Sequence, residues 1–289
     1  RSQTVTGVQT CALPISTLDG LAAARRVLRR ERRRTVDERE AFAAFREAVV
    51  DVPAERDRPT SPVTPTAPLS PTSPVPSSGP PTGPAGGTAA VRDAYERTVM
   101  AVPHYEEEYG DSTAESLAAE LCPEAATGLV EFDRLTPWLK RGVVDGAETA
   151  RLERERFVEG LDAEADSLCG SEDRLAAVHG EVGSLADEPV PDFGAQDAVR
   201  ARLGVLADRC DAVAADRQAA LREWQERFDA PVAVPDLPRY LYADLDTTYP
   251  VLATVAAVGE RVDRLRRRVE REMATPSSGA TLPRDDADV

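Results

Sequence analysis

Between residues 137 and 185, apolar side chains recur at alternating intervals of three and four positions along the chain. This spacing aligns them on one face of an α-helix and is typical of a seam that is buried against other helices. The seam consists of Leu139, Val143, Ala147, Ala150, Phe157, Leu161, Ala165, Leu168, Leu175, Val178, Val182 and Leu185. A helix this long cannot bury its seam alone, so we expect the other helices of the chain to pack on it.

The start of this helix and a break within it are marked by local signals. Thr136 is a suitable N-cap, and Pro137 occupies the first helical position, where proline is tolerated. Gly170 and Ser171 predict a break, with Ser171 capping a second helical segment.

Other amphipathic segments follow the same period, and Ser112 with Glu115 forms a capping box at the start of one of them. These segments span residues 17–50, 89–101, 112–121, 195–228 and 248–273. Short connections near Glu188 and Ala230 would place successive long helices side by side and antiparallel. The sequence therefore predicts an all-α protein, an elongated antiparallel helical bundle or coiled coil with a separate N-terminal helix on a disordered Pro-rich linker.

Residues 5–15 read VTGVQTCALPI, which resembles the translation of a common sequencing-adapter oligonucleotide at every position. We therefore interpret residues 1–16 as an assembly artefact and leave them out of fold reasoning. Without Cys11, the chain has three cysteines, an odd number that includes no CxxC pair. This pattern argues against a disulfide framework.

Composition divides the remaining chain into a helix, a spacer, a domain and a tail. Residues 51–88 are rich in Pro, Ser, Thr and Gly and predict a disordered or polyproline-like spacer. This spacer separates an Arg-rich helix at residues 17–50 from a helical domain at residues 89–274, so the first helix could dock, dimerise or stay apart. Residues 275–289 form a polar tail that we expect to be disordered.

Acidic residues outnumber basic ones in this chain by 51 to 35, which gives a net charge of -16, and Lys140 is its only lysine. This balance, together with much Ala and Val, is typical of a haloarchaeal cytoplasmic protein. The carboxylates of such a protein bind water and cations in molar KCl, where the Debye length is about 3 Å. No apolar run approaches the ~20 residues of a membrane-spanning helix, so we expect no membrane span.

Three stretches of the chain resemble an uncharacterised family of haloarchaeal proteins that carries a domain of unknown function. They are AYERTVMAVPHYEEEYGDSTAESLAAEL at residues 94–121, LTPWLKRGVVDGAETARLERERFVEGLDAEADSL at 135–168 and YLYADLDTTYPVLATVAAVGERV at 240–262. The Arg-rich first helix ahead of a variable linker also fits this family. The resemblance supports the helical fold and the haloarchaeal setting, and it implies no activity, cofactor or catalytic residue.

The run HYEEEY places His104 next to Glu106, Glu107 and Glu108. A histidine with clustered carboxylates could ligate a metal or share a proton. These residues are sequential rather than one helical turn apart, and no HExxH motif is present. The pattern favours a structural turn, and a metal-dependent enzyme around His104 is the alternative.

The first helix carries a dense cluster of arginines, which consists of Arg25, Arg26, Arg29, Arg30, Arg32, Arg33 and Arg34. A basic helix on a flexible linker could lie along DNA phosphates. The alternative is that these arginines pair with Glu31, Glu38 and Glu40 or with an acidic neighbouring helix. Charge pairing is favoured, because molar salt weakens phosphate contacts and a net charge of -16 repels nucleic acid.

Two further stretches near the C-terminus are open to structural or functional interpretation. A second arginine cluster suits the C-terminal dipole end of the last helix and is expected to serve packing and charge pairing. It consists of Arg264, Arg266, Arg267, Arg268 and Arg271. The tyrosines of YLYADLDTTYP at residues 240–250 are expected to plug the end of the bundle, and a groove for a partner helix is the alternative.

The chain has no recognisable nucleophile turn, GxGxxG loop or phosphate-binding GxxxxGK[ST] loop. We therefore expect a non-enzymatic helical interaction or scaffold protein of the haloarchaeal cytoplasm, without a cofactor. Its partners would be proteins, including further copies of itself that associate through helical seams. A nucleic-acid-associated or regulatory protein that uses the arginines of the first helix is the alternative.

Overall fold

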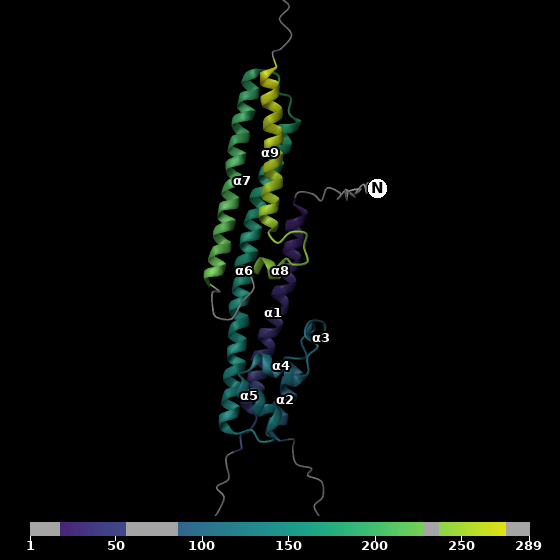
Figure 1. Cartoon of the computed structure of the whole chain (residues 1–289), viewed down its shortest axis with the longest axis vertical. Helices are drawn as coiled ribbons and strands as arrows, with labels where there is room; N and C mark the ends of the chain where they lie inside the picture. Colours follow the sequence, from purple (N-terminus) through teal and green to yellow (C-terminus); the bar gives the residue numbers. More distant parts are fainter. Residues whose placement is uncertain (1–17, 56–85, 228–236, 276–289) are drawn as a thin grey trace, which may run out of the picture. The chain divides into compact units, whose positions relative to one another are not determined.

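The computed structural model describes residues 18–55, 86–227 and 237–275, and its regular elements are all α-helices (Figure 1). Within these ranges there is no strand, so the predicted all-α class is confirmed. The predictions for residues 1–16, for most of the spacer and for nearly all of the tail lie outside the described residues. The helices are α1 (Asp19–Asp51), α2 (Gly87–Thr98), α3 (Tyr105–Glu108), α4 (Thr113–Glu120), α5 (Pro123–Glu131), α6 (Pro137–Asp187), α7 (Phe193–Arg227), α8 (Leu237–Leu241) and α9 (Pro250–Ala274).

The helix α6 runs without interruption through Gly170 and Ser171, so the predicted break is wrong. The Ser171 hydroxyl donates to the Ser167 carbonyl, 2.8 Å away and one turn earlier, instead of capping a new helix. A helical glycine costs about 1 kcal/mol relative to alanine. This cost is small beside the burial of Leu168 and Leu175 on either side of the glycine, which keeps the helix continuous.

Two predicted N-caps are confirmed by their hydrogen bonds. At the start of α6, the Thr136 hydroxyl accepts from the backbone N–H of Leu139 at 3.2 Å. At the start of α4, the Ser112 hydroxyl accepts from the backbone N–H of Glu115, and the Glu115 carboxylate accepts from the backbone N–H of Ser112 at 3.0 Å. These contacts satisfy backbone donors that have no partner inside the helix.

The sequence analysis names no helix at the positions of α3, α5 and α8, and α5 is the longest of these three. It has only 9 residues, too few for a helical period to repeat convincingly. Its burial comes from Ala125, Ala126 and Leu129, and Pro123 stands at its first position. The proline at this position was the available sequence signal.

The chain divides into two compact units, which are described separately. Unit 1 comprises Arg1–Glu31 and Gly160–Val289, and unit 2 comprises Arg32–Glu159. Two long helices, α1 and α6, contribute residues to both units.

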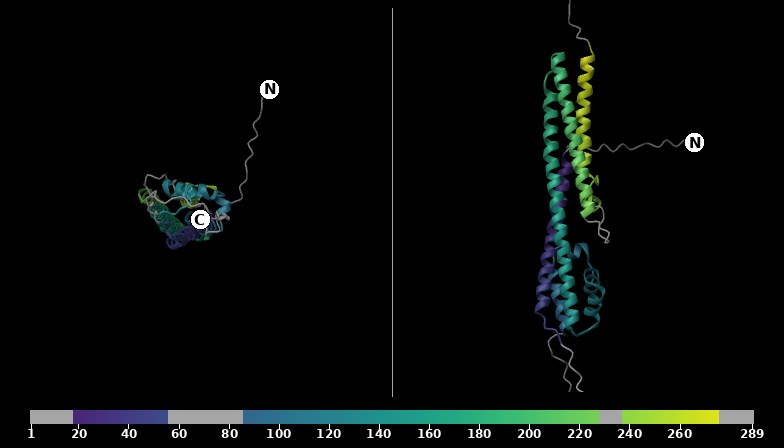
Figure 2. Two further views of the ribbon diagram at one scale, coloured as in Figure 1. Left: turned by 90° about the horizontal axis from the view of Figure 1, so that it is seen from below. Right: turned by 90° about the vertical axis from the view of Figure 1, so that its left-hand side faces the viewer.

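In unit 1, α6 and α7 run antiparallel, as predicted. Arg202 of α7 pairs with Glu181 of α6, whereas Arg217, later in α7, pairs with Glu164, earlier in α6. The helix α9 packs beside α7 (Figure 2). Successive contacts of α9 with α6 advance in the same direction along both helices, at Arg261 with His179 and then at Arg268 with the Ala186 carbonyl. The three helices therefore alternate in direction along the chain.

In unit 2, the second half of α1 is part of the core. Phe42, Phe45 and Val49 are at most 1% exposed and lie in one apolar cluster with residues of α2, α4, α5 and α6. The Phe45 and Tyr95 rings meet edge to face, with centroids 5.1 Å apart. Burying each of these phenylalanines contributes about 1.5–3 kcal/mol. Of the alternatives left open for the first helix, docking is therefore the one that the structure shows, because α1 packs through its own seam.

Both flanks of the spacer are held by the loop between α5 and α6. The backbone N–H of Glu55 donates to the Leu135 carbonyl at 2.8 Å. On the other flank, a side chain at Gly86 would clash with the Asp133 carbonyl, and the Thr88 hydroxyl donates to the Phe132 carbonyl at 2.5 Å. The described residues on either side of the spacer therefore contact the same loop.

Candidate functional site

In unit 2, Glu38 of α1 accepts hydrogen bonds from three residues, two that flank α3 and one on α6. Its Oε1 atom lies 3.0 Å from Nε2 of His104 and 3.2 Å from the Tyr109 hydroxyl. Its Oε2 atom accepts from Nε of Arg154 at 3.2 Å. Sequence reasoning named Glu38 only as a charge partner for the arginines of the first helix. It missed the contact with His104, because the two residues lie 66 positions apart and no local motif connects them.

Arg154 of α6 joins two carboxylates in the same place. Its second guanidinium nitrogen donates to Glu120 at 2.6 Å, and its guanidinium carbon lies 4.9 Å from the centroid of the Phe42 ring. Burial by itself lowers the pKa of Arg154, but the Glu120 and Glu38 carboxylates outweigh it and raise the pKa above the usual value. Arg154 is therefore a permanent cation in this cluster.

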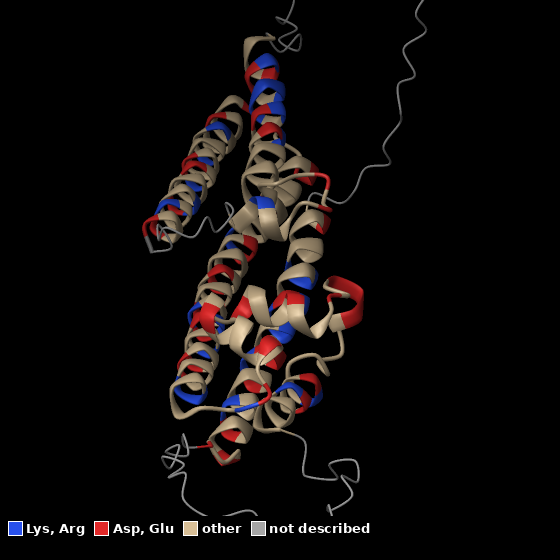
Figure 3. Ribbon diagram, turned by 60° about the horizontal axis from the view of Figure 1, so that its bottom comes forward, with Lys and Arg blue, Asp and Glu red and all other residues tan. Residues whose placement is uncertain are grey.

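The structure brings only part of the predicted metal-ligand set together. Glu38, His104 and Glu108 offer ligand atoms that all lie within 4.8 Å of one another, whereas Glu106 and Glu107 are exposed on α3 and stay outside this group. Figure 3 shows the acidic residues gathered on α3.

Both carboxylates of this group already hold a guanidinium. Arg34 pairs with Glu108, and Arg154 pairs with Glu38. A metal ion bound by Glu38, His104 and Glu108 would have to displace both arginines. The geometry therefore favours a charge-paired structural cluster, and a metal-dependent enzyme at His104 remains a hypothesis.

The arginines of α1 separate into paired and unpaired sets. Arg25 pairs with Glu172 at 2.8 Å, Arg34 pairs with Glu108, and Arg32 also has an interaction partner. The other four are exposed, and no carboxylate among the described residues pairs with them. They are Arg26, Arg29, Arg30 and Arg33. Their spacing places them along one face of the helix, so charge pairing accounts for only part of the cluster.

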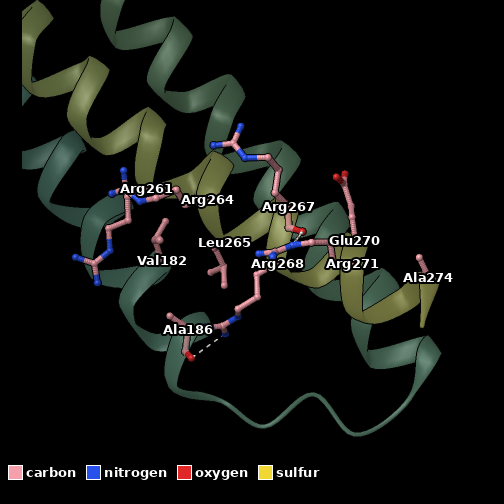
Figure 4. Close-up of a pocket in the computed structure, with 10 residues that line it drawn as sticks. All are labelled: Val182, Ala186, Arg261, Arg264, Leu265, Arg267, Arg268, Glu270, Arg271 and Ala274. Carbon is pink, nitrogen blue, oxygen red and sulfur yellow. Dashed lines mark hydrogen bonds between the residues drawn. The ribbon is translucent and has the colours of Figure 1, made fainter. Parts of the chain in front are cut away.

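A groove of about 690 Å³ lies between the C-terminal part of α6 and α9 (Figure 4). Val182 and Leu265 lie between the arginine side chains in Figure 4, and Ala186 and Ala274 complete its apolar lining. The charged side chains that line it are Arg261, Arg264, Arg267, Arg268, Arg271 and Glu270. The lining thus carries five cations and one anion on a chain whose net charge is -16.

The arginines of this groove are only loosely paired. Arg264 lies 3.4 Å from Glu260 and Arg268 lies 3.7 Å from Glu272, each pair on one exposed face of α9. Within the described ranges, no carboxylate pairs with the side chains of Arg267 or Arg271. The Arg271 Nε donates instead to the backbone carbonyl of residue 267 at 3.1 Å. The expectation that this cluster serves packing and charge pairing therefore fits only some of its members.

At the inner edge of the groove, Arg261 donates to Nε2 of His179 at 3.2 Å. Burial and then the Arg261 charge lower the pKa of His179, so the neutral imidazole is favoured. Because Nε2 accepts this hydrogen bond, the ring proton sits on Nδ1, which is buried without a partner among the described residues. This histidine fixes the position of Arg261 at the groove.

The stretch at residues 240–250 divides between a buried and an exposed tyrosine. Tyr242 is fully buried, and its hydroxyl donates to Glu164 at 2.7 Å. Tyr240 is 49% exposed and donates to Glu31 at 2.5 Å. Burial and then the Glu164 charge raise the pKa of Tyr242. The plug interpretation therefore fits Tyr242 alone, because Tyr240 and Tyr249 are exposed.

Comparisons with known proteins place the chain in a family without naming an activity. None of the helices in the described ranges combines the length and the apolar character needed to cross a membrane. No curated protein and no solved structure matches the chain. A family model described as a domain of unknown function, DUF7260, matches residues 19–266, which is most of the chain. The chain therefore belongs to the family defined by this domain of unknown function.

Proposed function

We propose that this chain is a non-enzymatic helical interaction protein, which binds an acidic amphipathic helix of a protein partner in the groove between α6 and α9. The observation that carries the proposal is the combination of an apolar floor and five arginines in one groove. On a chain with a net charge of -16, this concentration of positive charge is a local exception. It is the kind of surface that attracts a negatively charged partner.

The dimensions of the groove fit a helix. Its lining runs from Arg261 to Ala274 on α9, which corresponds to about 20 Å along a helix axis. An amphipathic helix that lies in a groove anchors its apolar side chains at helical spacing. Ala186, Ala274 and the aliphatic stems of the arginines offer apolar contact for such anchors above the buried Val182 and Leu265, and guanidinium groups bind carboxylates in a two-point geometry.

The chemistry of the lining supports binding over catalysis. It offers cations, apolar side chains and the single carboxylate of Glu270. A nucleophile with an adjacent base, which covalent catalysis requires, is not among these lining residues. Nucleic acid is also disfavoured in this groove, because phosphate backbones present no apolar side chains to its floor.

The test uses the full chain and a synthetic helical peptide with leucine on one face and glutamate on the flanks. Fluorescence anisotropy measures its affinity for the parent chain and for the double variant Arg267→Gln/Arg271→Gln. We expect at least a tenfold loss of affinity, which corresponds to about 1.4 kcal/mol. The control Arg222→Gln/Arg239→Gln removes the same charge from exposed positions outside the groove. Equal losses in both double variants, or no binding by the parent chain, would refute the proposal.

A second candidate function is nucleic-acid binding through α1. The observation that favours it is the row of Arg26, Arg29, Arg30 and Arg33, which no described carboxylate pairs with. Phosphate contacts would supply its affinity, and that affinity would fall steeply with salt. Light scattering with absorbance at 260 nm, on the full chain in molar KCl, separates the candidates. A nuclease-sensitive excess at 260 nm would favour nucleic acid, and an oligomer without this excess would favour protein association.

We also propose the haloarchaeal cytoplasm as the setting in which this interaction takes place. The support is the excess of acidic residues and the presence of a single lysine. In molar salt, surface charges are screened within about 3 Å. The apolar floor of the groove would then contribute a larger share of the affinity than the arginines do at low salt.

A further inference from the structure

A second, smaller pocket of about 70 Å³ lies within unit 2. Apolar side chains of α1 and of the segment after α2 form one side of it, and its other side is polar. The polar lining consists of Glu38, Tyr105, Tyr109, Asp111, Ser116, Glu120 and Arg154. This pocket is separate from the groove of the proposed function, which lies in unit 1.

The Tyr105 hydroxyl is the first sign that the pocket receives a ligand. Tyr105 is only 5% exposed, and its hydroxyl is buried without a hydrogen-bond partner among the described residues. Burial raises the pKa of Tyr105, the nearby Ser116 hydroxyl lowers it, and the charges of Asp111 and Glu120 raise it, so that on balance the pKa is raised and the hydroxyl is neutral. The Ser116 hydroxyl itself is hydrogen-bonded to the Tyr95 hydroxyl at 2.8 Å. Buried polar groups in folded proteins are nearly always satisfied, which points to a polar ligand or water at this hydroxyl.

The charge of the lining is the second sign. Glu38, Asp111 and Glu120 carry three negative charges, and Arg154 supplies one positive charge. Arg154 is bound to Oε1 of Glu120, and no described residue bonds to Oε2 of Glu120 or to the Asp111 carboxylate. Two carboxylate groups therefore have oxygen lone pairs to spare beside the unpaired tyrosine hydroxyl.

We propose that this pocket binds a hydrated Ca²⁺ ion through oxygen atoms of Asp111, Glu120, Ser116 and Tyr105. All of these donors are oxygens, which hard cations prefer over nitrogen and sulfur ligands. A water molecule takes about 30 Å³ in the liquid, so the pocket has room for one ion with one or two waters. Calcium suits this site better than magnesium, because it accepts irregular oxygen sets at variable distances.

The neighbouring group of Glu38, His104 and Glu108 is a poorer ion site. Arg154 and Arg34 already bind its two carboxylates. An ion at the Asp111 and Glu120 oxygens leaves both of these ion pairs intact. Glu120 is also paired with Arg154, but only through Oε1, so the ion would bind Glu120 through Oε2. The proposed Ca²⁺ site thus has other ligands than the Glu38, His104 and Glu108 group. Metal binding would break the ion pairs of Arg154 with Glu38 and of Arg34 with Glu108 only at that group.

Terbium, a luminescent substitute for calcium, tests the proposal on the full chain, because nearby tyrosines sensitise its emission. We expect terbium emission when tyrosine is excited, and we expect added Ca²⁺ to abolish this emission by displacing the terbium. Terbium should bind at least tenfold more weakly to Glu120→Gln and to Asp111→Asn than to the parent chain. Glu107→Gln is the matched control, because it removes one exposed carboxylate from α3 outside the pocket. No emission, or the same affinity in all three variants, would overturn the proposal.

Thermal unfolding supplies a second measurement that does not depend on luminescence. We expect Ca²⁺ to raise the melting temperature of the parent chain and to raise that of Tyr105→Phe by less. Without Ca²⁺, Tyr105→Phe should melt at or above the parent temperature, because it removes an unpaired buried hydroxyl. If Ca²⁺ raised the melting temperature of the parent chain and of Tyr105→Phe by the same amount, the assignment of Tyr105 to the site would be overturned.

Discussion

Arg217 and Glu164 form a two-point ion pair inside unit 1, with both nitrogen–oxygen distances at 2.8 Å. Arg217 also donates to the Ser167 hydroxyl at 3.1 Å, and Glu164 accepts a third hydrogen bond from Tyr242. Both side chains of the pair are at most 6% exposed. The pair fixes α7 and the turn after α8 against α6, with each polar group satisfied.

Removing one partner of this pair should destabilise the fold severely. Arg217→Met leaves the Glu164 carboxylate buried without its cation, and such losses cost about 3–5 kcal/mol. Urea denaturation should show this decrease in the free energy of unfolding. The double variant Glu164→Leu/Arg217→Met should recover most of the loss, because it leaves no unpaired charge. If the double variant is less stable than Arg217→Met, the loss has another origin.

The unfolding free energy should also depend on pH through Glu181. A hydrogen bond from Arg202, together with the charges of Arg202 and Arg209, lowers the pKa of Glu181 from its usual 4.5. Its stabilising contribution is therefore fully present above pH 4.5 and is lost as the pH falls through the lowered pKa of the folded state.

Comparison with Glu181→Gln isolates this contribution. The stability difference between the parent and this variant should shrink as the pH falls below 4.5. Glu153→Gln, at an exposed α6 position, should show no such change. Urea titrations at a series of pH values measure both differences. A difference for Glu181→Gln that is constant with pH would contradict the assignment.

Sequence analysis predicted the features that follow from helical periodicity and local capping. It missed the features that depend on contacts between residues far apart in the chain. The seam of α6 and the caps at Thr136 and Ser112 are local patterns. The structure confirms both caps and most of the seam, although Phe157, Ala165 and Leu185 are only half-buried. The break at Gly170 was wrong because tertiary burial outweighs a local glycine cost. The contacts of Glu38 with His104, Tyr109 and Arg154 could not be found, since these partners lie on two other segments of the chain.

The docking of α1 was also beyond the sequence. Its seam predicted burial, but the spacer that follows it suggested independence. The structure shows that the spacer begins and ends at one loop, so its length does not separate the helix from unit 2. Composition identified the spacer in the sequence. Only the structure, through the positions of Glu55 and Gly86, shows that both of its flanks contact the loop between α5 and α6.

The only lysine of the chain should stabilise the end of α1. The Lys140 ammonium donates to the Val50 and Val52 carbonyls, both at 2.6 Å. Carbonyls at a helix C-terminus have no partner within the helix, and a cation there also favours the helix dipole. Lys140→Met should lower the unfolding free energy by about 1–2 kcal/mol. Arg141→Met, at the adjacent exposed position, is the control and should change it much less. If Lys140→Met and Arg141→Met lowered the thermal stability equally, a capping role of Lys140 at the end of α1 would be contradicted.

Replacing residues 56–85 by eight Gly and Ser residues should leave unit 2 folded, because both flanks are held by the loop at residues 132–136. Shortening the closed segment should add about 1 kcal/mol of stability through a smaller loss of chain entropy. Circular dichroism would report unchanged helix content, and thermal unfolding an equal or higher midpoint. Gly86→Val in the parent chain should have the opposite effect, since its side chain would meet the Asp133 carbonyl. A shortened chain that loses helix content would mean that the spacer itself contributes contacts to the fold.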